Sequence, residues 1–94
     1  MSRAEEVRQT VRTKDRVEFE LLAKKIKRLR EKQGLSKRKL SAAVGRDRNF
    51  IFSVEKGLIY PDFATILDIL TALGADHGEV IREVVTEAAS RSST

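Results

Sequence analysis

The amino-acid sequence predicts a small all-α domain of about five helices. Apolar residues recur at steps of three and four along nearly the whole chain, which is the period of an amphipathic helix. A single proline, Pro61, interrupts the 94 residues, and no strand pattern competes with the helical one. The length is enough for one hydrophobic core and too short for two, so we expect one compact domain.

The first strongly patterned helix is predicted at residues 15–32. Asp15 and Glu18 have the spacing of a capping box, and Gly34 is placed to end the helix. Its apolar stripe consists of Phe19, Leu22, Ile26 and Leu29. The stripe predicts that one face of this helix is buried.

Residues 1–14 form a polar extension before this helix. Ser2 and Glu5 have capping-box spacing, which favours a short separate helix or a lengthening of the next one. With only Val7 and Val11 as regularly spaced apolar residues, a flexible segment is the third alternative.

A short helix over about 37–43 is predicted next. Ser36 can cap it, Leu40 and Ala43 would face the core, and Gly45 lies where a tight turn would follow.

A third helix is expected over about 48–55. Asp47 can cap it, and Ile51 and Val54 would face inward. Two short helices across a turn that contains glycine describe a helix-turn-helix.

Two further helices complete the domain. Asp62 can cap a fourth, which ends at Gly74 and has the strongest apolar face of the chain: Phe63, Ile66, Leu67, Leu70 and Leu73. Asp76 and Glu79 begin a fifth, which continues through Val80, Ile81, Val84, Val85 and Ala88. The chain thus divides into an extension (1–14), a helix-turn-helix unit (15–75) and a C-terminal helix with a frayed tail (76–94).

Charge is unevenly distributed along the chain. The net charge is +5, but residues 21–56 carry twelve basic and three acidic side chains, whereas residues 57–94 carry two and six. A stretch this basic predicts a surface that meets a polyanion, the alternative being an ordinary solvated helix face. An anionic membrane surface is disfavoured because the stretch lacks a large apolar face.

Composition excludes several classes of site. The chain has no cysteine and one histidine, His77, so disulfides, cysteine zinc sites and paired-histidine metal sites are excluded and no cofactor is expected. An enzyme is disfavoured, because the candidate carboxylate pairs are better explained as helix caps and solvated charges: Asp62 with Asp68, and Glu79 with Glu83. Apolar runs are too short for a membrane span, so we expect a cytoplasmic protein.

Residues 25–75 contain a series of features in a fixed order: Ile26, Leu29 and Arg30, then Gly34-Leu35-Ser36, Leu40-Ser41, Gly45, Ile51, Val54-Glu55, Gly57, Pro61 and the run from Ile66 to Leu73. In this order the segment resembles the Cro/phage-repressor type of helix-turn-helix domain, the Xre family. The run from Asp47 to Ile51 is also similar to the controller proteins of restriction-modification systems. The resemblance implies a compact five-helix fold, in which Glu55 pairs with Arg30 of the first helix.

The resemblance also makes the third helix the one that reads DNA. Its candidate base-contacting residues are Arg48, Asn49, Ser53 and Phe52. Phe52 departs from the small polar residue common there, so it either touches a thymine methyl group or packs against a neighbouring helix.

Contacts to the DNA backbone are expected from basic residues around the motif: Lys37, Arg38, Arg46 and Lys56. Lys37 replaces a usual glutamine, and Arg46 replaces a usual apolar residue.

The fifth helix is expected to support a homodimer through Val80, Ile81, Val84 and Val85, although packing on the fourth helix is the alternative for these side chains. The function implied is a dimeric, sequence-specific regulator of transcription on double-stranded DNA, either a repressor or an autoregulating controller. The alternative is an antitoxin-type module that masks a partner protein and regulates its own gene.

Overall fold

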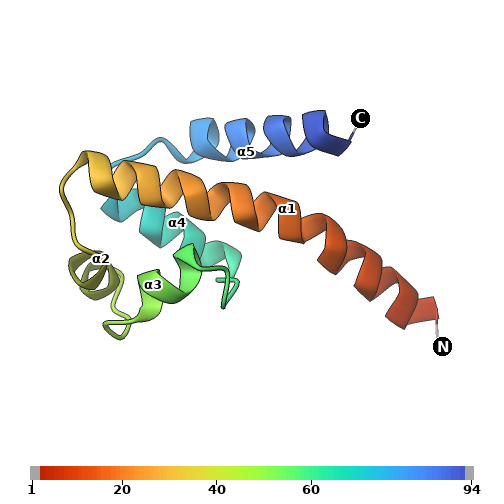
Figure 1. Cartoon of the computed structure of the whole chain (residues 1–94), viewed down its shortest axis with the longest axis horizontal. Coiled ribbons are helices and arrows are strands. Elements are labelled where there is room, and N and C mark those ends of the chain that lie inside the picture. Colours follow the sequence, from red (N-terminus) through yellow and green to blue (C-terminus); the bar gives the residue numbers. More distant parts are fainter. Residues whose placement is uncertain (1–2, 93–94) are drawn as a thin grey trace.

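A computed structural model of the chain describes the backbone of residues 3–92 and the side chains of residues 17–91. This part of the chain folds into five helices and contains no strand, which confirms the predicted all-α class (Figure 1). The helices are α1 (Arg3–Lys32), α2 (Lys37–Ala43), α3 (Phe50–Glu55), α4 (Phe63–Ala72) and α5 (His77–Ser92).

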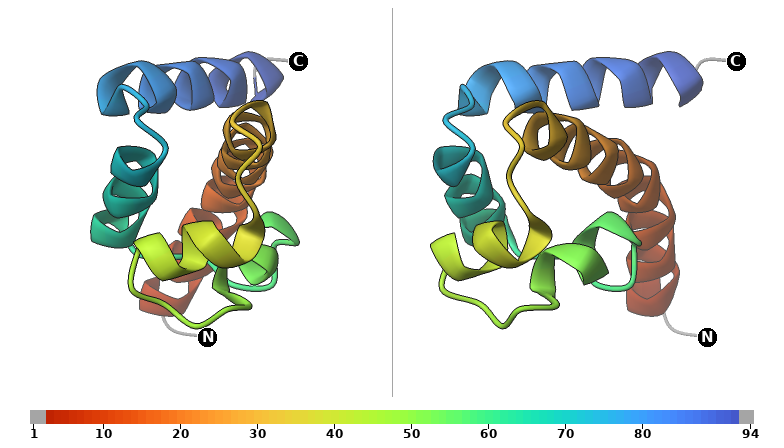
Figure 2. Two further views of the ribbon diagram at one scale, coloured as in Figure 1. Left: turned by 90° about the vertical axis from the view of Figure 1, so that its left-hand side faces the viewer. Right: turned by 60° about the vertical axis from the view of Figure 1, so that its left-hand side comes forward.

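The long helix α1 is the centre of the arrangement. α5 packs along one side of α1. On the opposite side of α1 lie α2 and α3, and α4 contacts both α5 and α2 (Figures 1 and 2). The short pair α2–α3 therefore forms one end of the molecule, away from α5. Among residues 3–92, none of the helices combines the length and the apolarity needed to cross a bilayer.

Of the three alternatives for residues 1–14, the structure confirms the lengthening of the next helix, so that helix does not begin at residue 15. α1 is continuous from Arg3, so Asp15 and Glu18 lie in the interior of a helix rather than at its start. Capping-box spacing also occurs in helix interiors, and the surrounding Arg, Glu, Gln and Lys residues are good helix formers. The proposed cap Ser2 lies outside the described residues.

The predicted N-caps of α2, α4 and α5 are confirmed. In each case a side-chain oxygen accepts a hydrogen bond from the backbone amide three residues later, at 2.8–3.0 Å. The capping residues are Ser36, Asp62 and Asp76.

The third helix starts two residues later than predicted. The Asp47 carboxylate accepts from the amide of Asn49 at 2.8 Å, and the Asp47 carbonyl accepts from the amide of Phe50 at 3.1 Å. A bond to the amide two residues on forms an Asx turn rather than a helix cap. Arg48 and Asn49 therefore belong to the turn that leads into α3.

One hydrophobic core joins all five helices. Its fully buried aliphatic side chains come from α1, α2, α3 and α4 and are Ile26, Leu40, Ile51, Ile69 and Leu70. Val54 is buried beside them, as predicted.

Two expected core residues are exposed. Ala43 lies on the outer side of α2, whereas Ser41 lies on the buried side of this helix. Phe63, in the first turn of α4, is 64% exposed because the buried face of that helix runs through Ile66, Ile69 and Leu70.

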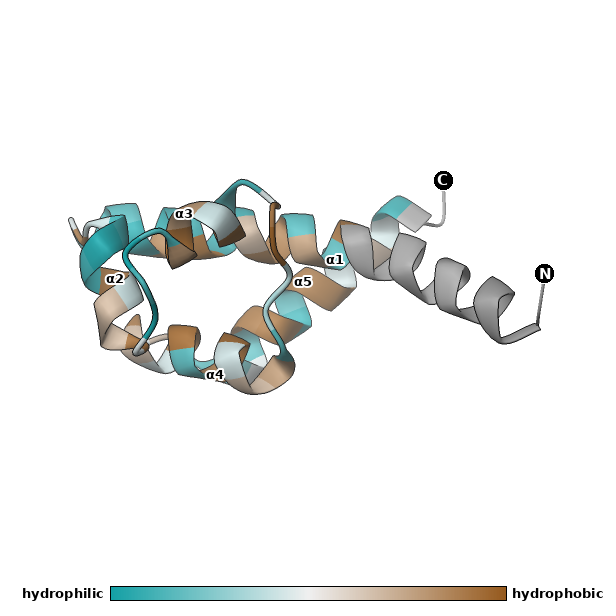
Figure 3. Cartoon of the chain, turned by 90° about the horizontal axis from the view of Figure 1, so that it is seen from below, coloured by the Kyte–Doolittle hydropathy of each residue, from teal (hydrophilic) through white to brown (hydrophobic). Residues whose placement is uncertain are grey.

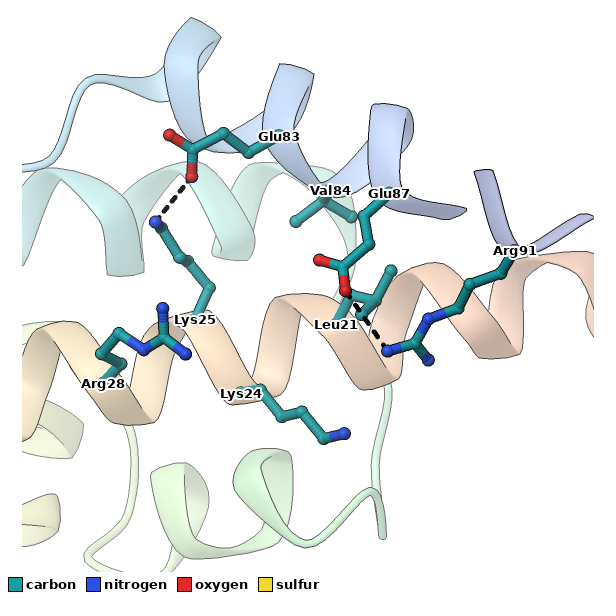
Figure 4. Close-up of a pocket in the computed structure, with 8 residues that line it drawn as sticks. All are labelled: Leu21, Lys24, Lys25, Arg28, Glu83, Val84, Glu87 and Arg91. Carbon is teal, nitrogen blue, oxygen red and sulfur yellow. Dashed lines mark hydrogen bonds and ion pairs between the residues drawn. The ribbon is translucent and has the colours of Figure 1, made fainter. Parts of the chain in front are cut away.

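The structure changes the expectation for α5. Val80 and Val84 are only 4% and 9% exposed within a single chain, where they belong to the same core as Leu21 and Leu22 of α1. Figure 4 shows Val84 above Leu21 between the two helices. Their burial requires no second subunit, so the prediction that these two valines form the subunit contact does not hold.

An ion pair closes the α1–α5 contact at its edge. Lys25 Nζ lies 2.6 Å from a carboxylate oxygen of Glu83 (Figure 4), and this hydrogen bond lowers the pKa of Glu83. Two predicted interface residues of α5 stay accessible: Ile81 is half-buried and Val85 is 52% exposed.

Candidate nucleic-acid interface

The turn between α2 and α3 is built around Gly45. Its φ angle is +71°, a left-handed conformation that side chains with a Cβ rarely adopt. The following amide, of Arg46, donates to the Ser41 carbonyl at 3.0 Å and closes the turn. From Arg46 to Asn49 the connection is exposed and hydrophilic, as Figure 3 shows.

Ser41 links the two helices of the motif. Its hydroxyl donates to the Lys37 carbonyl at 2.8 Å and accepts from the amide of Ile51 at 3.0 Å. Because Ser41 is fully buried, this bond satisfies an amide in the first turn of α3 that water does not reach. Sequence reasoning missed this role, although the polar residue directly after buried Leu40 was a usable signal.

A buried ion pair holds the other end of α3. The Glu55 carboxylate accepts two hydrogen bonds from the guanidinium of Arg30, at 2.7 and 3.1 Å. The same guanidinium donates to the Leu35 carbonyl at 2.9 Å. The bonds to Glu55 raise the pKa of Arg30. The predicted pairing is confirmed, and it fixes α3 to the end of α1.

One side of α3 and its leading turn remains accessible. Phe50, Ile51 and Val54 point into the core, while the other side presents a strip that we call the reading stripe. Its members are Arg48, Asn49, Phe52, Ser53 and Lys56. Ser53 is half-buried and the other four are exposed. All four candidate base-contacting residues are thus at least partly accessible, along α3 and the turn that leads into it.

Phe52 is not part of the core. It is 40% exposed, and its ring contacts two lysines. The ammonium of Lys37 is 5.3 Å from the ring centroid and that of Lys56 is 5.9 Å from it, both within the range of a cation–π contact. Both predictions for Phe52 therefore stay predictions: the ring contacts Lys37 of the neighbouring helix α2, and 40% of the residue is exposed to a ligand.

Arg46 also contacts an aromatic ring. It is exposed, and its guanidinium carbon lies 4.4 Å from the centroid of Phe50. The charge of Arg46 also acts on Asp62, the N-cap of α4. Hydrogen bonds from Thr65 lower the pKa of the Asp62 carboxyl, and the positive charge of Arg46 lowers that pKa further. Contact with the ring gives the guanidinium a fixed place at the surface beside the turn.

The motif carries a strong excess of positive charge. Residues 36–56 contain six basic and two acidic side chains, and one of the acids, Glu55, is paired with Arg30. The candidate phosphate-contacting residues Arg38, Arg46 and Lys56 are exposed, and Lys37 is half-buried. A surface of this charge attracts a polyanion and releases its counterions on binding.

Comparison with known proteins agrees with this geometry. Residues 21–84 match the helix-turn-helix domain family. The chain belongs to this family. The matched segment runs from the buried part of α1 to the middle of α5, so it includes the whole of α2, α3 and α4. No curated protein and no solved structure matches the chain.

Membership in this family explains why some residues of the domain hold α3 in place while others stay accessible on its outer side. In such domains the second helix of the motif enters the major groove of DNA. Here that helix is α3, held by Ser41 at its start and by Glu55 at its end. Within the described residues, no group of three His, Cys, Asp or Glu side chains could hold a metal ion.

Proposed function

We propose that this helix-turn-helix domain is a sequence-specific, DNA-binding regulator of transcription. The observation that carries the proposal is the reading stripe, which is accessible and polar at its start while both ends of α3 are fixed by buried polar contacts. A recognition helix that is already held in place loses little conformational entropy on binding, which favours discrimination between bases.

The residue types on the reading stripe suit base recognition. Arg48 can donate two hydrogen bonds to guanine O6 and N7, and Asn49 can bond adenine N6 and N7. Ser53 lies one helical turn further along α3, where its hydroxyl can donate or accept. Lys37, Arg38 and Arg46 flank the stripe and would contact phosphates, which positions the helix without reading sequence.

Within the family, we assign the chain to the Cro/phage-repressor type, with some similarity to the controller proteins of restriction-modification systems. The run Asp47-Arg48-Asn49 at the entrance to α3 supports this assignment. A single small domain of this kind acts by occupying an operator, where it blocks polymerase or positions it. The protein would act as a repressor or autoregulating controller in the cytoplasm, where the DNA lies.

A dimer follows from the number of bases that one helix can read. One recognition helix contacts too few base pairs to select a genomic site, whereas a two-fold dimer reads two half-sites about one helical turn apart. An apolar groove of about 160 Å³ between α1, α4 and α5 supports this step. Its more accessible residues are Phe19, Phe63, Ile81 and Val85. We propose the groove as the subunit contact in place of the buried pair Val80 and Val84.

A second function is supported by a different apolar surface. Leu58, Ile59 and Tyr60, in the connection after α3, are 68%, 40% and 47% exposed. Figure 3 shows the hydrophobic part of this connection. If this segment stays uncovered in the dimer, the chain would suit an antitoxin that masks a partner protein and represses its own gene.

Selection of bound duplexes from a random DNA pool tests the proposed function. We expect enrichment of one sequence, present as two inverted copies with centres about ten base pairs apart or a multiple of this spacing. Enrichment of a single unrepeated half-site would contradict the dimer. Recovery of no preferred sequence would contradict specific recognition and leave the protein-masking function as the better account.

A further inference from the structure

The exposed aromatic ring on the reading stripe is the feature that DNA binding by arginine and asparagine leaves unexplained. Phe52 is 40% exposed although its neighbours Phe50 and Ile51 are buried at 5% and 0%. The Phe52 ring therefore does not fill the core, and the exposure of this ring to water is unfavourable in the free protein. What distinguishes Phe52 from the other exposed apolar residues is its place on the reading stripe, where an apolar partner on DNA would cover the ring.

The position of the ring narrows the choice of partner. Phe52 lies one helical turn from Lys56 in the sequence and 5.3 Å from the ammonium of Lys37 on α2. Both lysines are expected to meet phosphates on the DNA backbone, and a ring on α3 in contact with both would then lie at the groove that α3 enters. Contacts with two lysines also restrict the rotation of the ring before DNA arrives.

The major groove offers one kind of apolar partner. Guanine, adenine and cytosine present only hydrogen-bond donors and acceptors there, whereas thymine also presents its C5-methyl group. A phenyl ring can neither donate nor accept a conventional hydrogen bond, so it gains nothing from the other base edges. Cytosine methylated at C5 presents the same group as thymine at the same place in the groove.

We infer that Phe52 binds the C5-methyl group of a pyrimidine, so that the protein reads a methyl group as part of its operator. The inference rests on the proposed function, because it requires α3 to lie in the major groove. It adds a ligand class: thymine or 5-methylcytosine at one position of each half-site. It also predicts that DNA methylation can change affinity at an operator that contains cytosine at this position.

Removal of single methyl groups from the DNA tests this inference. Each thymine of the selected half-site is replaced in turn by deoxyuridine, which lacks only the methyl group, and affinity is measured by fluorescence anisotropy at fixed salt. Burial of one methyl group corresponds to about a fourfold change in affinity. We therefore expect one thymine per half-site at which the loss is about fourfold, and roughly fifteenfold when both half-sites are changed.

The second arm separates the two sources of the methyl group. At the sensitive position the thymine–adenine pair is replaced by a cytosine–guanine pair, with or without a methyl group at cytosine C5. The methylated pair should bind about fourfold more tightly than the unmethylated pair. Equal affinity for the two pairs would restrict the contact to thymine and overturn the predicted sensitivity to methylation.

Variants of the protein assign the effect to Phe52. Phe52→Ala should bind thymine and deoxyuridine duplexes equally, whereas Phe52→Leu, which keeps an apolar side chain, should retain part of the difference. Leu58→Ala, which truncates a 68% exposed side chain outside the reading stripe, is the matched control and should retain all of it. Circular dichroism should show that each variant remains folded, because both residues lie outside the core.

The outcomes distinguish this inference from the proposed function. Specific binding that is indifferent to every thymine methyl group, or methyl dependence that persists in Phe52→Ala, would overturn the inference while leaving DNA recognition intact. A chain without preference for any duplex would overturn both.

Discussion

Loss of the ion pair between Arg30 and Glu55 should destabilise the whole domain. The substitution Glu55→Ala removes the acceptor of two hydrogen bonds at 2.7 and 3.1 Å. The two side chains are only 9% and 5% exposed, so the pair is largely shielded from water. The guanidinium would keep a single described acceptor, the carbonyl of Leu35.

The magnitude follows from this burial. Removing one partner of a buried ion pair costs about 3–5 kcal/mol, because the other charge is left without compensation. A domain of this size has roughly 5–15 kcal/mol of stability in total. At about 4–8 °C per kcal/mol for 60–100 residues, the midpoint of thermal unfolding should fall by roughly 12 °C or more. Thermal and urea unfolding, followed by circular dichroism, measure the change.

An exposed ion pair supplies the control. Glu87→Ala breaks the pair with Arg91, whose side chains are 58% and 47% exposed, and should cost about 0.5 kcal/mol or less. The double variant Arg30→Met/Glu55→Leu should recover much of the loss, because an apolar pair of similar volume leaves no buried charge. A loss below about 1 kcal/mol for Glu55→Ala would refute the claim that this pair fixes α3 to α1.

Three further substitutions test separate parts of the account. Ser41→Ala leaves the buried amide of Ile51 without an acceptor and should cost about 1–3 kcal/mol in urea unfolding; a loss under about 0.5 kcal/mol would show that the hydroxyl is dispensable. Lys37→Ala should weaken binding to all DNA sequences and reduce the slope of log affinity against log salt by about 0.9, and an unchanged slope would remove Lys37 from the phosphate contacts. Val85→Asp should yield a folded monomer by sedimentation while the matched charge control Thr86→Asp stays dimeric, and a dimeric Val85→Asp would place the subunit contact elsewhere.

Local signals predicted the fold well where the chemistry is local. The caps at Ser36, Asp62 and Asp76 each need only one side chain and an amide three residues away, so their sequence signature is reliable. Asp47 has the same signature but bonds the amide two residues on, and the start of α3 was therefore misplaced. Backbone geometry, which the sequence does not display, decided between the two.

Tertiary packing decided the remaining differences. The periodicity of α5 showed that Val80 and Val84 are buried but not against which surface, and α1 supplies that surface within the same chain. Ser41 was missed because its role depends on the approach of α3 across the turn. The cations beside Phe52 were known individually, whereas their convergence on its ring depends on the angle between α2 and α3.

The central claim is that α3 reads bases through the reading stripe, and Arg48→Ala tests it most directly. Affinity for the selected duplex and for an unrelated duplex is compared between the wild type, this variant and Arg82→Ala, which removes the same charge from α5. A bidentate contact with guanine predicts that Arg48→Ala loses about 1–3 kcal/mol on the selected duplex and much less on the unrelated one, while Arg82→Ala retains the discrimination. Equal losses for Arg48→Ala on both duplexes would contradict base reading by this residue and reduce its role to a phosphate contact.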